Sequence, residues 1–234
     1  MRPLPWAVYL FDVDGTLVDA GGAGRRAFEL AVGDRCGPAN GALRGLRLDG
    51  LTDRLIVRKA LELLGRPFED GLCDGLLARY VERLREEIGG PGYAVLPGVV
   101  AALDALAARG AVVGLCTGNV VEGARLKLGR GGIDRYFDWG ASAVFGFAAD
   151  GEEREKLVHA ALRRAGARLG RALAPREALV VGDTPRDVDA AHHAGCPVLA
   201  VATGRYGEAE LRACGAEHVV PTLEHPDALR ILLG

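Results

Sequence analysis

Four short apolar segments, each followed by glycine, threonine or aspartate, constrain the fold more than any other feature of the sequence. They span residues 8–11, 111–116, 178–181 and 197–202. Short, continuous apolar segments of this kind are typical of strands that are buried on both faces of a parallel sheet. Residues with helical spacing separate the later segments, so the sequence predicts an α/β fold with a parallel, Rossmann-like sheet. A weaker strand is expected near residues 141–144.

One connection is too long for a single crossover helix. About 80 residues separate Gly15 from Leu96, whereas a strand–helix–strand crossover needs roughly a dozen. Apolar residues recur with helical spacing within this connection, over residues 55–64 and 76–88. Residues 25–32 are a third helix candidate, so the long connection is expected to be helical.

This pattern predicts two structural units. Residues 1–15 and 96–234 are expected to form the α/β core, and residues 16–95 an inserted helical domain. Gly89-Gly90-Pro91-Gly92 is the expected hinge by which the chain returns to the core.

Charge and cysteine content exclude several classes of protein. The 29 basic and 31 acidic residues give a net charge of −2, which predicts no binding to nucleic acid or to an anionic membrane. No apolar run approaches the roughly 18–20 residues that cross a bilayer. The five cysteines are widely spaced without a C-x-x-C pair, which argues against a disulfide framework or a zinc site. We expect a cytoplasmic protein; the sequence is silent on its oligomeric state.

Acidic residues follow two of the predicted strands. Asp12 and Asp14 come after the first strand, and Asp183 and Asp187 come after the third. Ligands of open parallel sheets bind at the C-terminal ends of the strands, so these carboxylates and Thr117 are expected to converge. An all-oxygen acidic cluster suits a hard cation, most plausibly Mg²⁺.

Residues 117–119 add a second element to this predicted site. Thr117-Gly118-Asn119 follows the second strand and offers a hydroxyl and backbone N–H groups that suit an anion such as phosphate. Taken singly, each aspartate is as compatible with a helix or turn cap as with a site. The four carboxylates and Thr-Gly-Asn together favour the site.

These motifs resemble those of the haloacid dehalogenase superfamily of phosphohydrolases, over nearly the whole chain. Residues 12–17 (DVDGTL) look like the first motif of that family, residues 115–119 (LCTGN) like the second, and residues 182–187 (GDTPRD) like the fourth. The segments 50–53 and 96–98 are similar to the phosphoglycolate-phosphatase-like branch, which carries a helical cap. The resemblance therefore implies this fold and a phosphatase activity.

The resemblance also implies roles for individual residues. Asp12 would attack phosphorus to form an aspartyl-phosphate, and Asp14 would protonate the leaving oxygen and then activate water. The metal ligands would be Asp12, Asp14 through its backbone carbonyl, Asp183 and Asp187. The phosphate-binding residues would be Thr117, Gly118 and Asn119.

The third motif of the family asks for a basic residue, and here two residues compete. Arg154 and Lys156 lie about 200° apart at a predicted helix start, so only one of them can face the site. The spacing to Leu157 resembles a branch of the family that uses arginine, and an arginine holds phosphate with two hydrogen bonds. We favour Arg154 as the phosphate ligand, with Lys156 as the alternative.

Five residues of the predicted insert keep two interpretations. Thr52 and Asp53 either cap a helix or shape the substrate entrance. Arg25, Arg26 and Arg47 are either solvated surface charges or ligands of an anionic substrate.

The sequence as a whole predicts a Mg²⁺-dependent phosphatase that acts on a small phosphorylated metabolite, with phosphoglycolate as the default. One alternative is a phosphosugar mutase of the same superfamily. A receiver-like phosphorylation switch is a further alternative, although it needs neither a helical insert nor a second acid. Dehalogenase chemistry is disfavoured because Asp14 supplies an acid that halide displacement does not need.

Overall fold

The core of the protein is a six-stranded parallel sheet. The computed structural model describes residues 3–39 and 41–234. The strands are β1 (Val8–Phe11), β4 (Val112–Cys116), β5 (Phe145–Gly146), β6 (Ala178–Gly182), β7 (Val198–Val201) and β8 (His218–Val220). Their order is β5-β4-β1-β6-β7-β8, and each neighbouring pair is parallel. The predicted α/β fold is confirmed.

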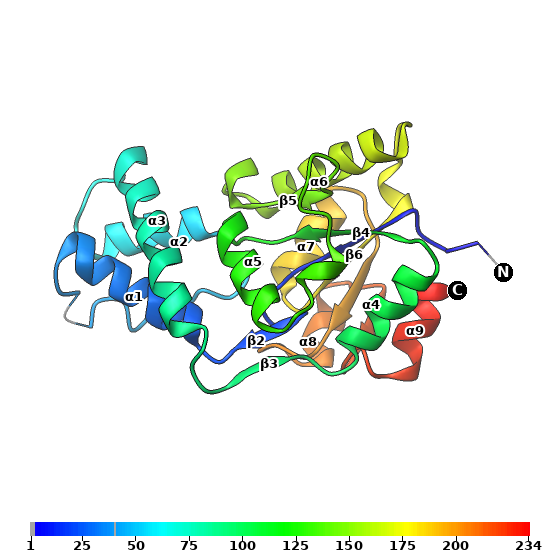
Figure 1. The fold of residues 1–234 in the computed structure, drawn as a ribbon, viewed down its shortest axis with the longest axis horizontal. Coiled ribbons are helices and arrows are strands. Elements are labelled where there is room, and N and C mark those ends of the chain that lie inside the picture. The colour runs from blue at the N-terminus through cyan, green and yellow to red at the C-terminus, as the bar shows by residue number, and fades with distance from the viewer. Residues whose placement is uncertain (1–2, 40) are drawn as a thin grey trace.

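Helices cover both faces of this sheet, as Figure 1 shows. One face carries α6 (Arg154–Leu169), α7 (Pro185–His193) and α8 (Glu208–Ala213), and the other carries α4 (Val99–Ala108), α5 (Val121–Arg130) and α9 (Pro226–Leu233). Successive residues of a strand point to opposite faces. In β1, Val8 and Leu10 therefore pack with α6 and α7, whereas Tyr9 and Phe11 pack with α4, α5 and α9. Burial on both faces explains why this strand is apolar throughout.

Three helices form a second unit beside the sheet, which we call the cap. They are α1 (Ala23–Cys36), α2 (Asp53–Leu63) and α3 (Asp70–Glu87), at the left of Figure 1. Their apolar faces meet in a hydrophobic cluster of their own that includes Phe28, Val57 and Leu84. The three helices predicted within the long connection are therefore present, each with bounds shifted by a few residues.

A two-stranded antiparallel ribbon joins the cap to the sheet. It consists of β2 (Val18–Ala20) and β3 (Tyr93–Val95). At the end of the ribbon nearest the cap, the two segments of backbone approach closely. Gly21 has a φ of 59°, and a Cβ there would lie 2.6 Å from the carbonyl carbon of Gly92. Val18 packs in the hydrophobic cluster of the sheet. The division of the chain at residues 15/16 and 95/96 stays a prediction.

The strand predicted at residues 141–144 lies later in the chain, at β5. Gly146 occupies a position where a Cβ would lie 1.9 Å from the carbonyl oxygen of Leu157, so α6 packs directly against the strand backbone. Phe145 contacts Trp139 and Phe147, with ring centroids 4.9 and 5.0 Å away. Glycine has a low strand propensity, which is why the sequence pattern placed this strand a few residues too early.

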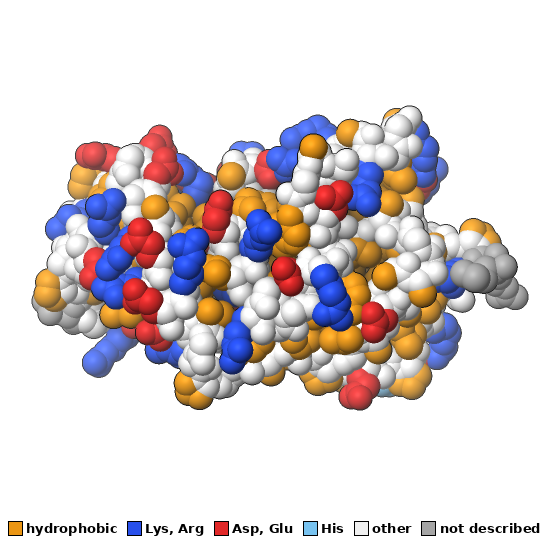
Figure 2. All heavy atoms as spheres, viewed as in Figure 1, with side chains coloured by type: hydrophobic (Ala, Val, Ile, Leu, Met, Phe, Trp, Pro, Cys, Tyr) orange, Lys and Arg blue, Asp and Glu red, His pale blue; other side chains and the backbone are white. Residues whose placement is uncertain are grey.

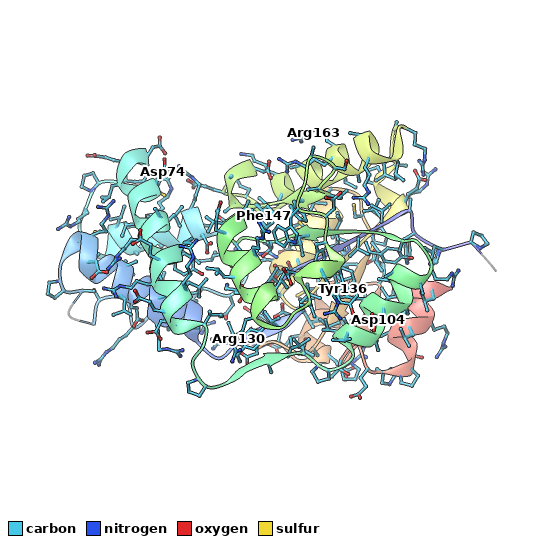
Figure 3. The ribbon with its side chains drawn as sticks, viewed as in Figure 1. Asp74, Asp104, Arg130, Tyr136, Phe147 and Arg163 are labelled. Carbon is cyan, nitrogen blue, oxygen red and sulfur yellow. The ribbon has the colours of Figure 1, made fainter. Side chains whose placement is uncertain are left out.

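Several short elements escaped sequence reasoning. These are β2, β3, β8, α9 and the 3₁₀ turns η1 (Asp134–Tyr136), η2 (Ala148–Asp150) and η3 (Pro175–Glu177). Such turns depend on contacts made elsewhere in the chain. Tyr136 in η1 donates a hydrogen bond of 2.6 Å to Asp104 in α4, and Figure 3 shows the two side chains next to each other.

The surface carries charges of both signs. On the face shown in Figure 2, Lys and Arg side chains alternate with Asp and Glu over the cap. Arg79 and Arg83 of α3, for example, share Asp34 of α1 at 2.7 and 2.8 Å. Among the described helices, none is both long and apolar enough to span a membrane.

The contact of β5 with α6 gives a first testable prediction. Gly146→Ala should lower the free energy of unfolding by about 1–3 kcal/mol, because the added methyl group overpacks against Leu157. Gly33→Ala, in α1, is the matched control: no neighbouring atom lies within 4 Å of an added Cβ, and alanine favours helix by about 1 kcal/mol. Urea unfolding of both variants measures the difference, and equal stabilities would contradict the close packing.

Candidate functional site

The predicted site residues meet at a cavity between the sheet and the cap. Asp12, Thr117 and Asp183 directly follow β1, β4 and β6. Because these strands are parallel neighbours, their C-terminal ends lie side by side. The cavity has a volume of about 390 Å³, within the range of pockets for small molecules. Arg25 and Tyr80 of the cap also line it.

Three buried carboxylates form an acidic cluster, and two of them, Asp12 and Asp183, line this cavity. Asp12, Asp183 and Asp187 each place an oxygen so that all three lie within 4.8 Å of one another. Burial raises the pKa of Asp12 to about 6, and Arg154 partly opposes this. Burial and the neighbouring Asp187 and Asp12 carboxylates raise the pKa of Asp183 well above its usual value. The cluster therefore favours a compensating positive charge.

The surroundings of Asp183 suit such a cation. Its Oδ1 accepts a hydrogen bond of 3.0 Å from the Thr16 hydroxyl, but within residues 3–39 and 41–234 no basic group lies within ion-pair distance of it. A Cβ on Gly15 or Gly204 would lie 2.3 or 1.9 Å from Oδ2, so two glycines bring the backbone close around this oxygen. Buried carboxylate oxygens without an ion-pair partner are suitable ligands for a hard cation.

Arg154 reaches the acidic cluster and Lys156 does not. The Arg154 guanidinium lies 3.2 Å from Asp12 Oδ2 and contacts Asp187 Oδ1, and its side chain is 8% exposed. Lys156 is exposed and pairs with Glu153 at 2.5 Å. Arg154 is the first residue of α6, and a step of two residues along a helix turns the side chain by about 200°. The geometry therefore favours Arg154 as the basic residue and places the alternative, Lys156, outside the site.

Asp187 has protein partners on both of its oxygens. Its Oδ2 accepts hydrogen bonds from the backbone N–H and the hydroxyl of Thr184, at 3.0 and 2.7 Å. This arrangement caps the first turn of α7. Its Oδ1 accepts from Arg154. Asp187 thus holds Arg154 toward Asp12, and its predicted role as a metal ligand stays a prediction.

The Thr117-Gly118-Asn119 loop lies between the acidic cluster and the cap. Asn119 Nδ2 donates hydrogen bonds of 2.8 Å both to Asp14 Oδ2 and to the Thr117 hydroxyl. A Cβ on Gly118 would lie 2.4 Å from the carbonyl oxygen of Leu51. Glycine is therefore required at position 118 for the cap to approach this closely.

Lys127 belongs to this site, although sequence reasoning gave it no role. It projects from α5 and places its ammonium 2.6 Å from Asp14 Oδ2 and 2.6 Å from Asn119 Oδ1. Burial alone would lower its pKa, but the nearby Asp14, Tyr80 and Asp53 raise it above the usual value. The one available signal was that lysine is rare in this chain, with three residues among 29 basic ones.

Thr52 and Asp53 attach the cap to the core. The Thr52 hydroxyl accepts from the backbone N–H of Leu55, which caps α2, and donates to the carbonyl oxygen of Glu152 at 3.1 Å. Asp53 accepts a hydrogen bond of 2.7 Å from the Val120 N–H, and its own N–H donates to Gly118. Burial raises the pKa of Asp53 to about 6, with Lys127 acting in the opposite direction. Thr52 is thus the N-cap of α2, whereas Asp53 lines the cavity.

The three arginines singled out in the cap differ in position. Arg25 lines the cavity and donates to Glu29 and to the carbonyl oxygen of Leu46. Arg26 instead pairs with Glu87 at 2.7 Å, and Arg47 is exposed.

The arrangement of this site agrees with a comparison to known protein families. A family model described as haloacid dehalogenase-like hydrolase matches residues 6–195. The chain belongs to this family. The resemblance inferred from the motifs is therefore confirmed.

Individual relatives of this hydrolase support the same family. It is 34% identical over 203 residues to a phosphoglycolate phosphatase from Yersinia pestis, covering 85% of this chain and 82% of the relative. Its fold is similar to that of a predicted phosphoglycolate phosphatase from Haemophilus somnus 129PT, with a TM-score of 0.70 and 20% identity over 97% and 98% of the two chains. A candidate beta-phosphoglucomutase from Thermotoga maritima has a TM-score of 0.62 and 21% identity over 96% and 97%. These two structural likenesses show the fold alone.

The contrast between Arg154 and Lys156 gives a second prediction. Arg154→Ala should lower kcat/KM toward a phosphate ester at least ten-fold, about 1.4 kcal/mol, because the site loses the cation beside Asp12. The kcat/KM of Lys156→Ala should stay within about two-fold of that of the parent hydrolase, since Lys156 is exposed, pairs with Glu153 and is not part of the cavity lining. Steady-state kinetics of both variants measure this. A larger loss in Lys156→Ala would reverse the assignment.

Proposed function

We propose that this hydrolase is a Mg²⁺-dependent phosphatase that cleaves a small phosphorylated metabolite through an aspartyl-phosphate on Asp12. One observation carries the proposal: Asp12 lines the cavity and lies beside both the Asp183 carboxylate and the Arg154 guanidinium. A carboxylate beside compensating positive charge is suited to attack phosphorus, because phosphoryl transfer depends mainly on positioning and charge stabilisation.

Each residue then has a distinct task. Asp12 attacks the phosphorus, and Asp14 protonates the leaving oxygen and later takes a proton from the attacking water. Arg154 binds the oxygens of the transferring phosphoryl group. The other phosphate-binding residues are Thr117, Gly118 and Asn119.

The donor set supports magnesium as the cofactor. The carboxylates of Asp12 and Asp183 would hold the ion, together with the backbone carbonyl of Asp14 and with Asp187 as a ligand or a neighbour. These are all oxygen donors, as Mg²⁺ prefers. When bound, the ion supplies positive charge that orients the phosphate and offsets the charge of the nucleophile.

The size and lining of the cavity support a small, anionic substrate. A volume of about 390 Å³ accommodates a phosphorylated metabolite, and Arg25 adds positive charge on the cap side. The relative from Yersinia pestis is named a phosphoglycolate phosphatase, so 2-phosphoglycolate is the first substrate to assay. A cytoplasmic location is part of the proposal, because all five cysteines are free.

Replacing the nucleophile is the direct test of this function. Asp12→Asn should reduce hydrolysis of p-nitrophenyl phosphate with Mg²⁺ by at least 10³-fold, since an amide cannot form the covalent intermediate. Asp189→Asn, an exposed position on α7, is the matched control and should retain full turnover. Release of inorganic phosphate is the readout. A mutase would instead return the phosphoryl group to a sugar, and a switch would label itself without turnover.

Metal binding should stabilise the fold in a pH-dependent way. Mg²⁺ at 100 times its Kd should add about 2.7 kcal/mol, or roughly 5–10 °C in Tm for a chain of this size. The pKa of Asp12 is raised to about 6 and that of Asp183 is also raised, so protons compete with the cation below pH 6. The gain in Tm should therefore shrink as the pH falls from 7.5 to 5.

Thermal unfolding with and without the ion measures this gain. Asp183→Asn should abolish it. An equal Mg²⁺-dependent shift in the parent protein and in Asp183→Asn would contradict this metal site.

A further inference from the structure

We infer that Lys127 is a positioning residue that fixes the Asp14 carboxylate for proton transfer, and that the cap holds Lys127 in place. The inference rests on the proposed function, because it concerns the acid/base step of that reaction. It is carried by a single juxtaposition: the buried Lys127 ammonium lies between Asp14 of the core and Tyr80 and Asp53 of the cap.

On the core side, Lys127 and Asn119 act on the same oxygen of Asp14. The Lys127 ammonium lies 2.6 Å from Oδ2, and Asn119 Nδ2 lies 2.8 Å from it. Lys127 also contacts Asn119 Oδ1 at 2.6 Å, so the three side chains form a closed triangle. Anchoring Oδ2 in this way orients Oδ1 for the proton transfer. The Asp14 side chain is 44% exposed while that of Lys127 is 5% exposed, which places the carboxylate at the cavity wall and its anchor behind it.

On the cap side, two residues complete the surroundings of Lys127. The Tyr80 hydroxyl of α3 accepts a hydrogen bond from the Lys127 ammonium, and the Asp53 carboxylate of α2 interacts with that ammonium electrostatically. Asp53 is itself attached to the core through the Val120 N–H at 2.7 Å. A buried ammonium needs such partners, since a buried charge without compensation costs several kcal/mol. Contact with the cap therefore supplies two of the partners that stabilise the Lys127 ammonium beside Asp14.

This role differs from that of Arg154. Arg154 lies beside Asp12 and Asp187, on the side of the nucleophile, whereas Lys127 contacts the acid/base residue. Removing Arg154 should impair every substrate alike, because every substrate carries the same phosphoryl group. Removing Lys127 should impair most those substrates whose leaving group needs a proton.

The test compares Lys127→Met with the parent enzyme on two substrates. p-Nitrophenyl phosphate has a leaving group that departs with little protonation, whereas the alkyl leaving group of 2-phosphoglycolate requires it. For Lys127→Met, kcat/KM should fall at least ten-fold more on 2-phosphoglycolate than on p-nitrophenyl phosphate. We use kcat/KM because it reports on steps through transfer to Asp12 and not on the later hydrolysis. If the parent enzyme does not cleave 2-phosphoglycolate, β-glycerophosphate is the alkyl substrate.

Three further variants exclude a purely structural effect. Asp14→Asn should show the same preference for the activated ester, and Lys59→Met, a lysine of α2 outside the cavity lining, should behave like the parent on both substrates. Tyr80→Phe removes only the cap hydroxyl and keeps the ring, so it tests the idea even if Lys127→Met folds poorly. In Tyr80→Phe, kcat/KM should also fall more on 2-phosphoglycolate than on p-nitrophenyl phosphate, but by less than in Lys127→Met. If Tyr80 acts through Lys127, adding Tyr80→Phe to Lys127→Met should change kcat/KM no further.

The outcomes separate this inference from the proposed function. Equal losses on the two substrates in Lys127→Met and in Tyr80→Phe, or no loss in either, would overturn the positioning role while leaving the phosphatase intact. Absence of turnover by the parent enzyme on any phosphate ester with Mg²⁺ would overturn the proposed function instead.

Discussion

The cost of burying several carboxylates together governs the architecture of this site. Parallel strands end side by side, so the aspartates that follow them are brought into one small volume. Like charges at such distances destabilise one another, and burial adds to that cost. Asp12 and Asp187 share Arg154, Asp14 pairs with Lys127, and Asp183 accepts a hydrogen bond from the Thr16 hydroxyl. The distribution of positive charge thus separates the proposed nucleophile, Asp12, from the proposed acid/base residue, Asp14.

The cap contributes more than a cover over this site. Its segment at residues 50–53 lies directly against the loop that begins at Thr117, and Gly118 permits that approach. Through Asp53 and Tyr80 the cap also completes the surroundings of Lys127. Contacts between the cap and the sheet therefore complete this site.

Much of the core could be predicted from local pattern. The apolar segments located β1, β4, β6 and β7, since strands buried on both faces carry no polar residue to obscure them. The polar residues that end these strands located the site. The predicted position of β5 was a few residues too early, because glycine at position 146 is required by the close contact with α6 and is not a residue that indicates a strand. Lys127 was not recognised as a site residue, because its contact with Asp14 joins residues 113 positions apart.

By itself, the sequence determined which residues follow each strand and therefore which carboxylates meet at the edge of the sheet. It also narrowed the basic residue to two candidates, because helical geometry allows only one of Arg154 and Lys156 to face the site. Only the tertiary structure decided that Arg154 faces inward and that Lys127 and Asp53 complete the site. The physical reason is that these positions depend on how the cap and α5 pack against the sheet, and such packing is set by burial between distant segments rather than by any local period.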